Sequence, residues 1–131
     1  MNNLRNDVLK EVDHLERVQA ELAEISRRTD DERLRELIQL RRRLSEQIAR
    51  VGKIAERYFE ESGAPDLVQE FRKHFTNMRS KAATHQASWP AVRLNEADEQ
   101  YQQSSRAVRE ANKAFVSWIR RALGATGPSN P

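Results

Sequence analysis

Residues 25–38, ISRRTDDERLRELI, decide the fold, because they determine whether the N-terminal half of the chain is one long helix or two. Apolar residues before this stretch recur at steps of three and four from Leu4 to Ile25, which is typical of an amphipathic helix. If that row continued, its next positions would be 29, 32, 36 and 39, but these carry Thr, Glu, Glu and Gln. A second apolar row begins instead at Leu34. The offset matches neither a three-residue nor a four-residue skip, which favours two separate helices.

The residues Thr29-Asp-Asp-Glu32 have the pattern of a helix start. In a capping box, the Thr29 oxygen accepts a hydrogen bond from the third helical N–H, and the Glu32 side chain reaches back to the cap. Acidic side chains in a first turn also interact favourably with the helix dipole. We therefore predict a tight reversal near Arg28–Thr29, with helices over residues 3–28 and 30–62. One continuous helix over both ranges is the alternative.

A glycine and two prolines delimit a third helix. Gly63 can take the left-handed conformation that closes a helix, and Pro65 suits a first helical turn because its missing N–H costs nothing there. Pro90 disfavours the helical conformation at the residue before it. The third helix is therefore predicted over residues 66–88.

A fourth helix is predicted over residues 95–123, since Asn95 is a favourable N-cap and Gly124 a favourable terminator. Four amphipathic helices with short connections indicate an all-α, antiparallel up-down-up-down four-helix bundle. We expect one domain over residues 1–123 and a disordered tail over residues 124–131, because the tail has nothing to pack.

The aromatic residues are unevenly distributed: all eight lie between Tyr58 and Trp118. The aromatic core should therefore belong to the end of the second helix and to the third and fourth helices. The first two helices are aliphatic until their far end and resemble a coiled coil. We expect an elongated bundle in which part of this N-terminal hairpin projects beyond the aromatic core and leaves apolar surface.

Composition narrows the functional classes. Charged residues make up 33% of the chain, above the usual ~25%, and no apolar run approaches the ~20 residues of a membrane span. There is no cysteine, so disulfides and thiolate metal sites are excluded. We expect a cytoplasmic protein without a membrane partner. The net charge of +3 reflects a small excess of basic residues spread among acidic ones, not a basic arm.

One dense group of cations stands out on the second helix. It contains Arg41, Arg42 and Arg43, followed by Arg50 and Lys53. These five are the candidate contacts for a protein partner or for phosphate. Arg41 also interrupts the apolar row, which predicts either an acidic partner across the interface or a solvated hairpin end. A second residue that departs from the helical pattern is Gly52. Glycine inside a helix costs about 1 kcal/mol relative to alanine, and it can permit a close helix contact or a bend.

Catalytic and metal sites are not expected. Glu11-x-x-His14 resembles half of a di-iron motif, but the nearest second pair, Glu70 and His74, is spaced by four rather than three. No histidine is followed by the lysine and glycine of a phosphotransfer bundle, and no glycine-rich loop presents a serine nucleophile. Ser104, in the middle of the fourth helix, should bond its own backbone or make room for a large neighbour. We expect a protein that is not an enzyme and needs no cofactor.

The stretch from His85 to Pro90 is predicted to form a structural corner between the third and fourth helices. Trp89 and His85 continue the apolar row of the third helix, and Pro90 stops that helix. His85 is a titratable group on this row. The favoured interpretation is a neutral, hydrogen-bonded core residue, and the alternative is a group whose protonation near pH 6–7 loosens the corner.

These features favour a helical protein that binds another protein, as an adaptor, a regulator or an export-type chaperone. An aliphatic hairpin with a polar surface and a loose tail is similar to the plan of flagellar and other secretion chaperones, a resemblance carried by no motif and no particular residue. A nucleic-acid-associated protein using the arginines of the second helix is the alternative. Homo-oligomerisation is also open.

Overall fold

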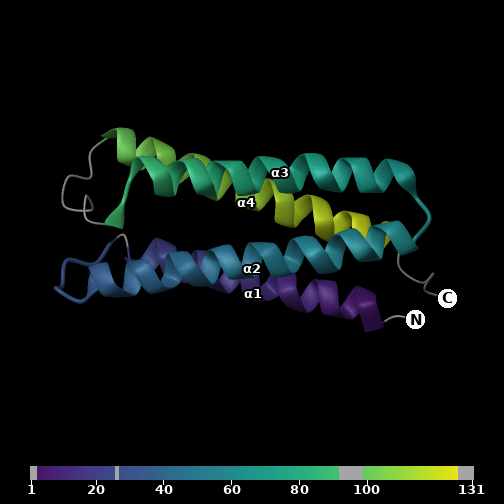
Figure 1. Cartoon of the computed structure of the whole chain (residues 1–131), viewed down its shortest axis with the longest axis horizontal. Helices are drawn as coiled ribbons and strands as arrows, with labels where there is room; N and C mark the ends of the chain where they lie inside the picture. The colour runs from purple at the N-terminus through teal and green to yellow at the C-terminus, as the bar shows by residue number, and fades with distance from the viewer. Residues whose placement is uncertain (1–2, 26, 92–98, 127–131) are drawn as a thin grey trace.

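The computed structural model describes residues 3–25, 27–91 and 99–126, and these form four helices packed as an elongated up-down bundle (Figure 1). Each helix runs antiparallel to the next and packs on it, and α1 also packs on α4. The predicted all-α, antiparallel four-helix bundle is therefore confirmed. The helices are α1 (Asn3–Ile25), α2 (Arg33–Glu61), α3 (Pro65–Ser88) and α4 (Glu99–Thr126).

The reversal between α1 and α2 exists, but it is wider than predicted. α1 ends at Ile25 rather than at residue 28, and α2 begins at Arg33 rather than at residue 30. Glu32 occupies the N-cap position in a helical conformation, and no side chain caps the helix there. The predicted capping box at Thr29 is therefore wrong.

Arg28 binds two acidic residues across the turn. Its Nε donates to Asp30 Oδ1 at 2.7 Å, and its Nη1 donates to Glu36 on the first turns of α2. One guanidinium thus holds both carboxylates across the reversal. A charge-assisted bond to arginine is stronger than a neutral capping bond, so the turn is organised around Arg28 instead of Thr29.

The other helix ends follow the predictions in part. Gly63 has φ +72°, the left-handed conformation expected after α2, and Pro65 is the first residue of α3. Gly124 does not end α4, which continues to Thr126, because glycine permits the left-handed conformation without requiring it. The predicted N-cap Asn95 and residues 127–131 of the predicted tail lie outside the described residues.

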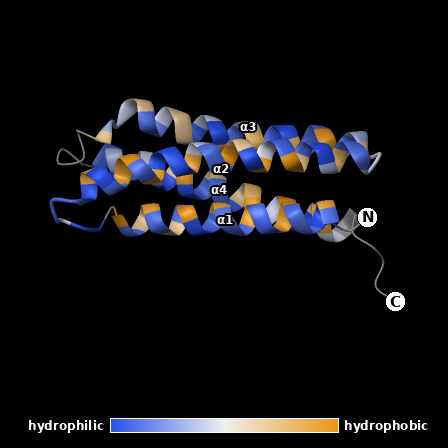
Figure 2. Cartoon of the chain, turned by 60° about the horizontal axis from the view of Figure 1, so that its bottom comes forward, coloured by the Kyte–Doolittle hydropathy of each residue, from blue (hydrophilic) through white to orange (hydrophobic). Residues whose placement is uncertain are grey.

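The main core joins all four helices, and apolar residues recur along every one of them among hydrophilic ones (Figure 2). Its aromatic part lies where the sequence predicts, at the end of α2 and on α3 and α4. Phe71 is at its centre, with ring centroids 5.4 Å from Phe75, 5.7 Å from Phe59 and 6.2 Å from Phe115. Contacts at these separations are typical of aromatic pairs in protein cores.

A second, smaller core covers the turn end of the first hairpin. Ile25, Leu37 and Leu40 are buried against Trp89 and Tyr101, which come from the end of α3 and the start of α4. The expectation that the hairpin projects with exposed apolar surface is therefore wrong. The reason is that two of the eight aromatic residues, Trp89 and Tyr101, lie at this end of the bundle rather than with the other six.

Candidate functional site

The predicted arginine triplet does not form one surface. Successive residues of an α-helix are 100° apart, so three neighbours point in three directions. Arg41 is half-buried between the helices, Arg42 is exposed, and Arg43 pairs with Glu21 of α1 at 3.2 Å. The expected acidic partner of Arg41 is absent from the described part of the chain, and Arg41 does not lie at a solvated hairpin end.

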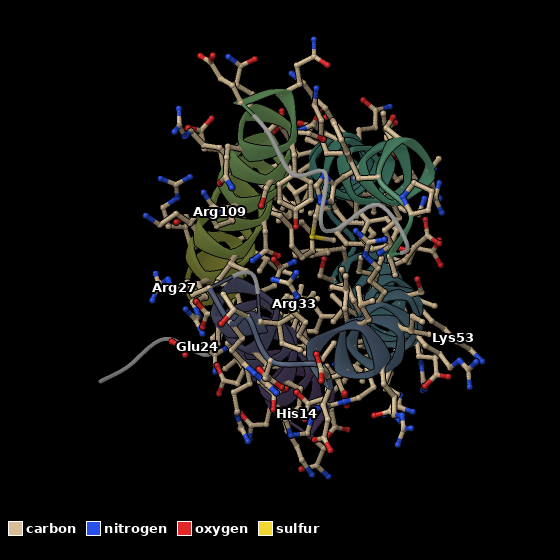
Figure 3. The ribbon with its side chains drawn as sticks, turned by 90° about the vertical axis from the view of Figure 1, so that its left-hand side faces the viewer. His14, Glu24, Arg27, Arg33, Lys53 and Arg109 are labelled. Carbon is tan, nitrogen blue, oxygen red and sulfur yellow. The ribbon has the colours of Figure 1, made fainter. Side chains whose placement is uncertain are left out.

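Arg50 and Lys53, the other two candidate contacts, lie on different sides of α2. Arg50 is exposed beside a shallow depression that Arg43 also lines, together with His14 and Arg17 of α1. Lys53 lines a groove between α2 and α3, and Figure 3 shows it at the outer edge of the bundle. Of the predicted cations, Arg43 and Arg50 thus share the α1 side of α2, whereas Arg41 lies in the interior and Lys53 on the α3 side.

The groove between α2 and α3 is a surface concavity with a volume of about 890 Å³. Its apolar floor comes from both helices and contains Ile48, Phe71, Phe75 and Ala82. These side chains are more than nine-tenths buried, yet they form the base of an open channel. A channel of this kind offers apolar contact to anything that lies between the two helices.

Gly52 determines how closely Phe75 approaches α2. A Cβ atom at Gly52 would lie 2.5 Å from Cζ of the Phe75 ring, which is closer than real Cβ contacts. The ring therefore lies directly over the glycine. Of the two interpretations of Gly52, a close contact rather than a bend is the one that the structure bears out.

The rim of this groove is mainly basic. Lys53, Arg72 and Arg79 line it together with one carboxylate, Glu56. Arg72 Nε donates to Glu56 at 2.6 Å, and this hydrogen bond raises the pKa of Arg72. The guanidinium of Arg79 lies 5.4 Å from the centroid of the Phe75 ring, in cation–π range. Arg72 also pairs with Glu60 of α2 at 3.5 Å, so three cations against two carboxylates leave the rim weakly positive.

His85 lies inside the bundle next to Arg41. Its Nδ1 is 2.7 Å from Ser104 Oγ, and its ring centroid is 5.3 Å from that of Tyr101. Ser104 thus bonds an imidazole and not its own backbone, which corrects the sequence-based expectation. Burial, together with the positive charges of Arg41 and Arg109, lowers the pKa of His85 to about 4. Protonation near pH 6–7 is therefore not expected in the folded protein.

Trp89 closes the corner that the sequence predicts. It is 8% exposed, its ring packs edge-on against Tyr101 at 5.5 Å, and its backbone N–H donates to the His85 carbonyl at 2.9 Å. Pro90 follows at the surface, beyond the last residue of α3. The stretch from His85 to Pro90 therefore ends a helix and covers the second core.

The two Glu–His pairs considered for metal binding remain separate. Glu11 and His14 are 3.7 Å apart, and Glu70 and His74 are 3.5 Å apart. Across residues 3–25, 27–91 and 99–126, no three histidine or carboxylate side chains gather as metal ligands would. His74 instead stacks on Trp118, with centroids 5.1 Å apart.

Sequence reasoning missed the α3 half of the groove. Positions 72, 76, 79, 83 and 86 recur at steps of four and three and carry Arg, Thr, Arg, Ala and Gln. This row of basic and small side chains beside the apolar row was a usable signal. It also missed Gln19 and Arg109, which the fold brings to the same interior cavity as Arg41 and His85, although nothing in their local sequence indicates this.

No helix in the described ranges combines the length and the apolar character needed to cross a bilayer. Comparison of the chain with models of protein families, with curated proteins and with solved structures found no match.

Proposed function

We propose that the protein binds an acidic amphipathic helix of another protein in the groove between α2 and α3. The observation that carries this proposal is the combination of an open apolar floor with a basic rim. Amphipathic helices bind grooves of this kind through apolar side chains spaced by three, four and seven residues. An adaptor, a regulator or an export-type chaperone would each use such a site.

The dimensions of the groove fit a short helix. The lining residues of α2 run from Ser45 to Glu56, which corresponds to roughly 17 Å, or three turns, at the helical rise of 1.5 Å per residue. Apolar anchors would contact Phe71 and Phe75, and carboxylates on the flanks of the bound helix would face Lys53 and Arg79. Complementary charge of this kind chiefly increases the association rate and the specificity.

The proposal assigns no catalytic step, cofactor or metal to this role. It describes a cytoplasmic binding protein, an assignment that accords with the absence of cysteine. Its rival is a nucleic-acid-associated protein using the arginines of α2. Arg43 and Arg50 share a face of α2, but Arg41 lies in the interior, and this separation weakens that rival because backbone phosphates are contacted by cations that share a face.

Site-specific photo-crosslinking in the native host tests the proposal. A crosslinking amino acid replaces Ala83, which is exposed and lines the groove, or Ala20, which is exposed on α1 away from it. We expect the probe at position 83, and not that at position 20, to capture a protein that contains an acidic amphipathic helix. Equal capture at both positions would contradict the proposal, and so would capture of a second copy of this chain alone.

The captured helix is then made as a labelled peptide for anisotropy titration. Arg79→Glu and Lys53→Glu should each weaken its binding about tenfold at low salt, and Lys113→Glu, an equal charge change on an exposed position of α4, should not. Generic duplex DNA should bind none of these proteins measurably. Salt-dependent DNA binding that all three substitutions reduce equally would favour the nucleic-acid rival.

A further inference from the structure

A second concavity lies between the helices of the bundle and differs from the groove in its lining. It has a volume of about 60 Å³, which exceeds the ~10–15 Å³ that one water needs on this measure. All four helices line it. Gln19 comes from α1, Arg41 from α2, His85 from α3, and Arg109 from α4.

The polar side chains of this cavity are cationic or neutral, and no acidic residue of the described chain lines it. Arg41 is half-buried there, and burial lowers the pKa of its guanidinium, although arginine stays charged. Arg109, an exposed residue of α4, also lines this cavity, and its Nη1 donates to Ser105 Oγ at 3.0 Å. Figure 3 shows Arg109 on α4 along the same side of the bundle as Glu24 of α1 and Arg27, which follows α1. A half-buried cation without an anion is costly, because desolvation is not offset by a partner.

Two neutral groups add hydrogen-bonding capacity at the same place. The side-chain Nε2 of Gln19 is buried and has no hydrogen-bond partner. His85 uses Nδ1 for Ser104, so its Nε2 is the ring nitrogen left for another partner, and the low pKa of the ring keeps it neutral. Buried amide N–H groups are nearly always satisfied, so an unpartnered one beside two guanidiniums points to an absent acceptor.

The apolar part of the lining is mainly aliphatic, and Tyr101 and Gln86 also line the cavity. The aliphatic residues are Leu22, Ala23, Leu37, Leu44, Ala82 and Val108. A fully hydrated inorganic anion would gain nothing from these walls, whereas the methylene groups of a small organic anion would be removed from water against them. Pockets with mainly apolar walls and a few convergent polar groups are typical of small-molecule sites.

We propose that this cavity binds a small organic carboxylate, with its carboxylate at Arg41 and Arg109 and its short apolar body against Leu37 and Leu44. Planar guanidinium groups match the geometry of a carboxylate and can bind it through two hydrogen bonds. Gln19 supplies a further donor. The site is independent of the proposed helix-binding groove and does not rest on it.

Titration of the full-length protein by ¹H–¹⁵N NMR tests the ligand class. The probes are acetate, butyrate and hexanoate, with butyramide as the uncharged counterpart and inorganic phosphate as the purely polar anion. Butyrate should shift the Gln19 side-chain amide resonances and bind at least tenfold more tightly than butyramide and phosphate. Absence of any shift with the three carboxylates would overturn the proposal, as would phosphate binding as tightly as butyrate.

Substitution at Arg41 tests the site itself. Arg41→Met keeps the length of the side chain and removes a half-buried charge, so the variant should remain folded with an unchanged or higher denaturant midpoint. Its affinity for butyrate should fall at least tenfold. Arg42→Met, on the neighbouring exposed residue, should leave that affinity unchanged. Equal affinity of the Arg41→Met variant and the native protein would contradict the assignment.

The titration of His85 provides an independent readout. The groups facing it are Arg41 from α2 and Tyr101, Ser104 and Arg109 from α4, with Gln19 of α1 in the same cavity. A bound carboxylate offsets the two positive charges, so saturating butyrate should raise the pKa of the His85 ring observed by NMR. An unchanged pKa at saturation would place the anion elsewhere and reject this site.

Discussion

At the scale of single residues, Gly52 and Gly124 are two glycines that both lie within helices but have different surroundings. Gly52 lies under the Phe75 ring, whereas nothing lies within 4 Å of a Cβ built at Gly124. Helix propensity alone favours alanine over glycine at both positions by up to about 1 kcal/mol. Only the packing distinguishes the two.

The first prediction follows from this pair. Gly52→Ala should destabilise the protein by about 1 kcal/mol, because displacement of the Phe75 ring outweighs the gain in helix propensity. Gly124→Ala, the control, should be neutral or stabilise by about 0.5 kcal/mol. Chemical denaturation measures both. Stabilisation by Gly52→Ala would show that Phe75 moves aside without cost.

The second prediction concerns His85 and pH. Its pKa is about 4 in the folded protein and near 6.5 in the unfolded chain, so the unfolded state binds the proton first as pH falls. The neutral ring therefore contributes its full stability above pH 6.5, and this stability is lost between pH 6.5 and 4. The loss should be roughly 2 kcal/mol after allowance for partial solvent exposure.

Denaturant midpoints at pH 7, 6, 5 and 4 measure this effect. His85→Gln cannot titrate, so its stability should fall less between pH 7 and 4 than that of the native protein. Carboxylates such as Asp30, whose pKa is lowered by its hydrogen bond to Arg28, contribute to both proteins and cancel in the comparison. Parallel pH profiles for the two proteins would disprove the role of His85.

At the scale of helices, polar contacts join α1 to α4 as well as apolar ones. Arg120 of α4 donates to Asp13 at 2.7 Å and to Glu16 at 2.5 Å, both on α1. Arg5 of α1 donates to the Leu123 carbonyl at 3.2 Å. These contacts join the first and last helices, which are not neighbours in sequence.

The third prediction concerns Arg120. Arg120→Gln should lower stability by about 0.5 kcal/mol at low salt, because exposed ion pairs contribute little even when two carboxylates share one cation. The difference should disappear near 1 M salt, where the screening length is about 3 Å. Arg121→Gln, on an exposed neighbour, is the control and should have no effect. A loss larger than ~2 kcal/mol would mean that the contact is far more than a surface pair.

The fourth prediction concerns the corner between α3 and α4. Trp89→Ala should destabilise by about 3 kcal/mol or more, because the indole covers the second core and packs on Tyr101. Ile38→Ala, on an apolar residue that is 51% exposed, should change stability by less than about 0.5 kcal/mol. A shift below ~1 kcal/mol for Trp89→Ala, measured by urea denaturation, would contradict the covering role.

At the scale of the whole molecule, the bundle contains two cores of unequal size. The larger one joins all four helices around the rings of Phe59, Phe71 and Phe115, and the smaller one contains five buried residues at the turn end. Local stability follows the density of buried apolar contacts. The two ends of the bundle should therefore open with different free energies.

The fifth prediction tests this asymmetry by native-state hydrogen exchange. Amide protons near Leu37 should exchange by local opening at lower free energy than those near Phe59 on the same helix. Trp89→Ala should widen the difference, because it removes part of the smaller core only. Uniform protection along α2 would show that the two cores open as one unit.

Much of the candidate site could not be predicted from the sequence. The cationic character of α2 was visible, but the division of Arg41, Arg42 and Arg43 depends on the rotation of that helix relative to its neighbours. Arg109 and Gln19 lie far apart in the chain and meet Arg41 only because four helices converge. The capping box failed because α2 begins only at Arg33, after a turn in which Arg28 binds Asp30 and Glu36, and propensity rules do not weigh such contacts.

The sequence by itself determined the number, type and antiparallel order of the helices, and it located the aromatic core. These properties depend on periodicity, glycine and proline, which act within a few residues along the chain. Only the tertiary structure decided that Trp89 and Tyr101 cover the turn end of the first hairpin, that Phe75 lies over Gly52, and that a half-buried arginine faces a histidine. The physical reason is that these contacts depend on how each helix is rotated against the others, and that rotation minimises the free energy of the whole core at once.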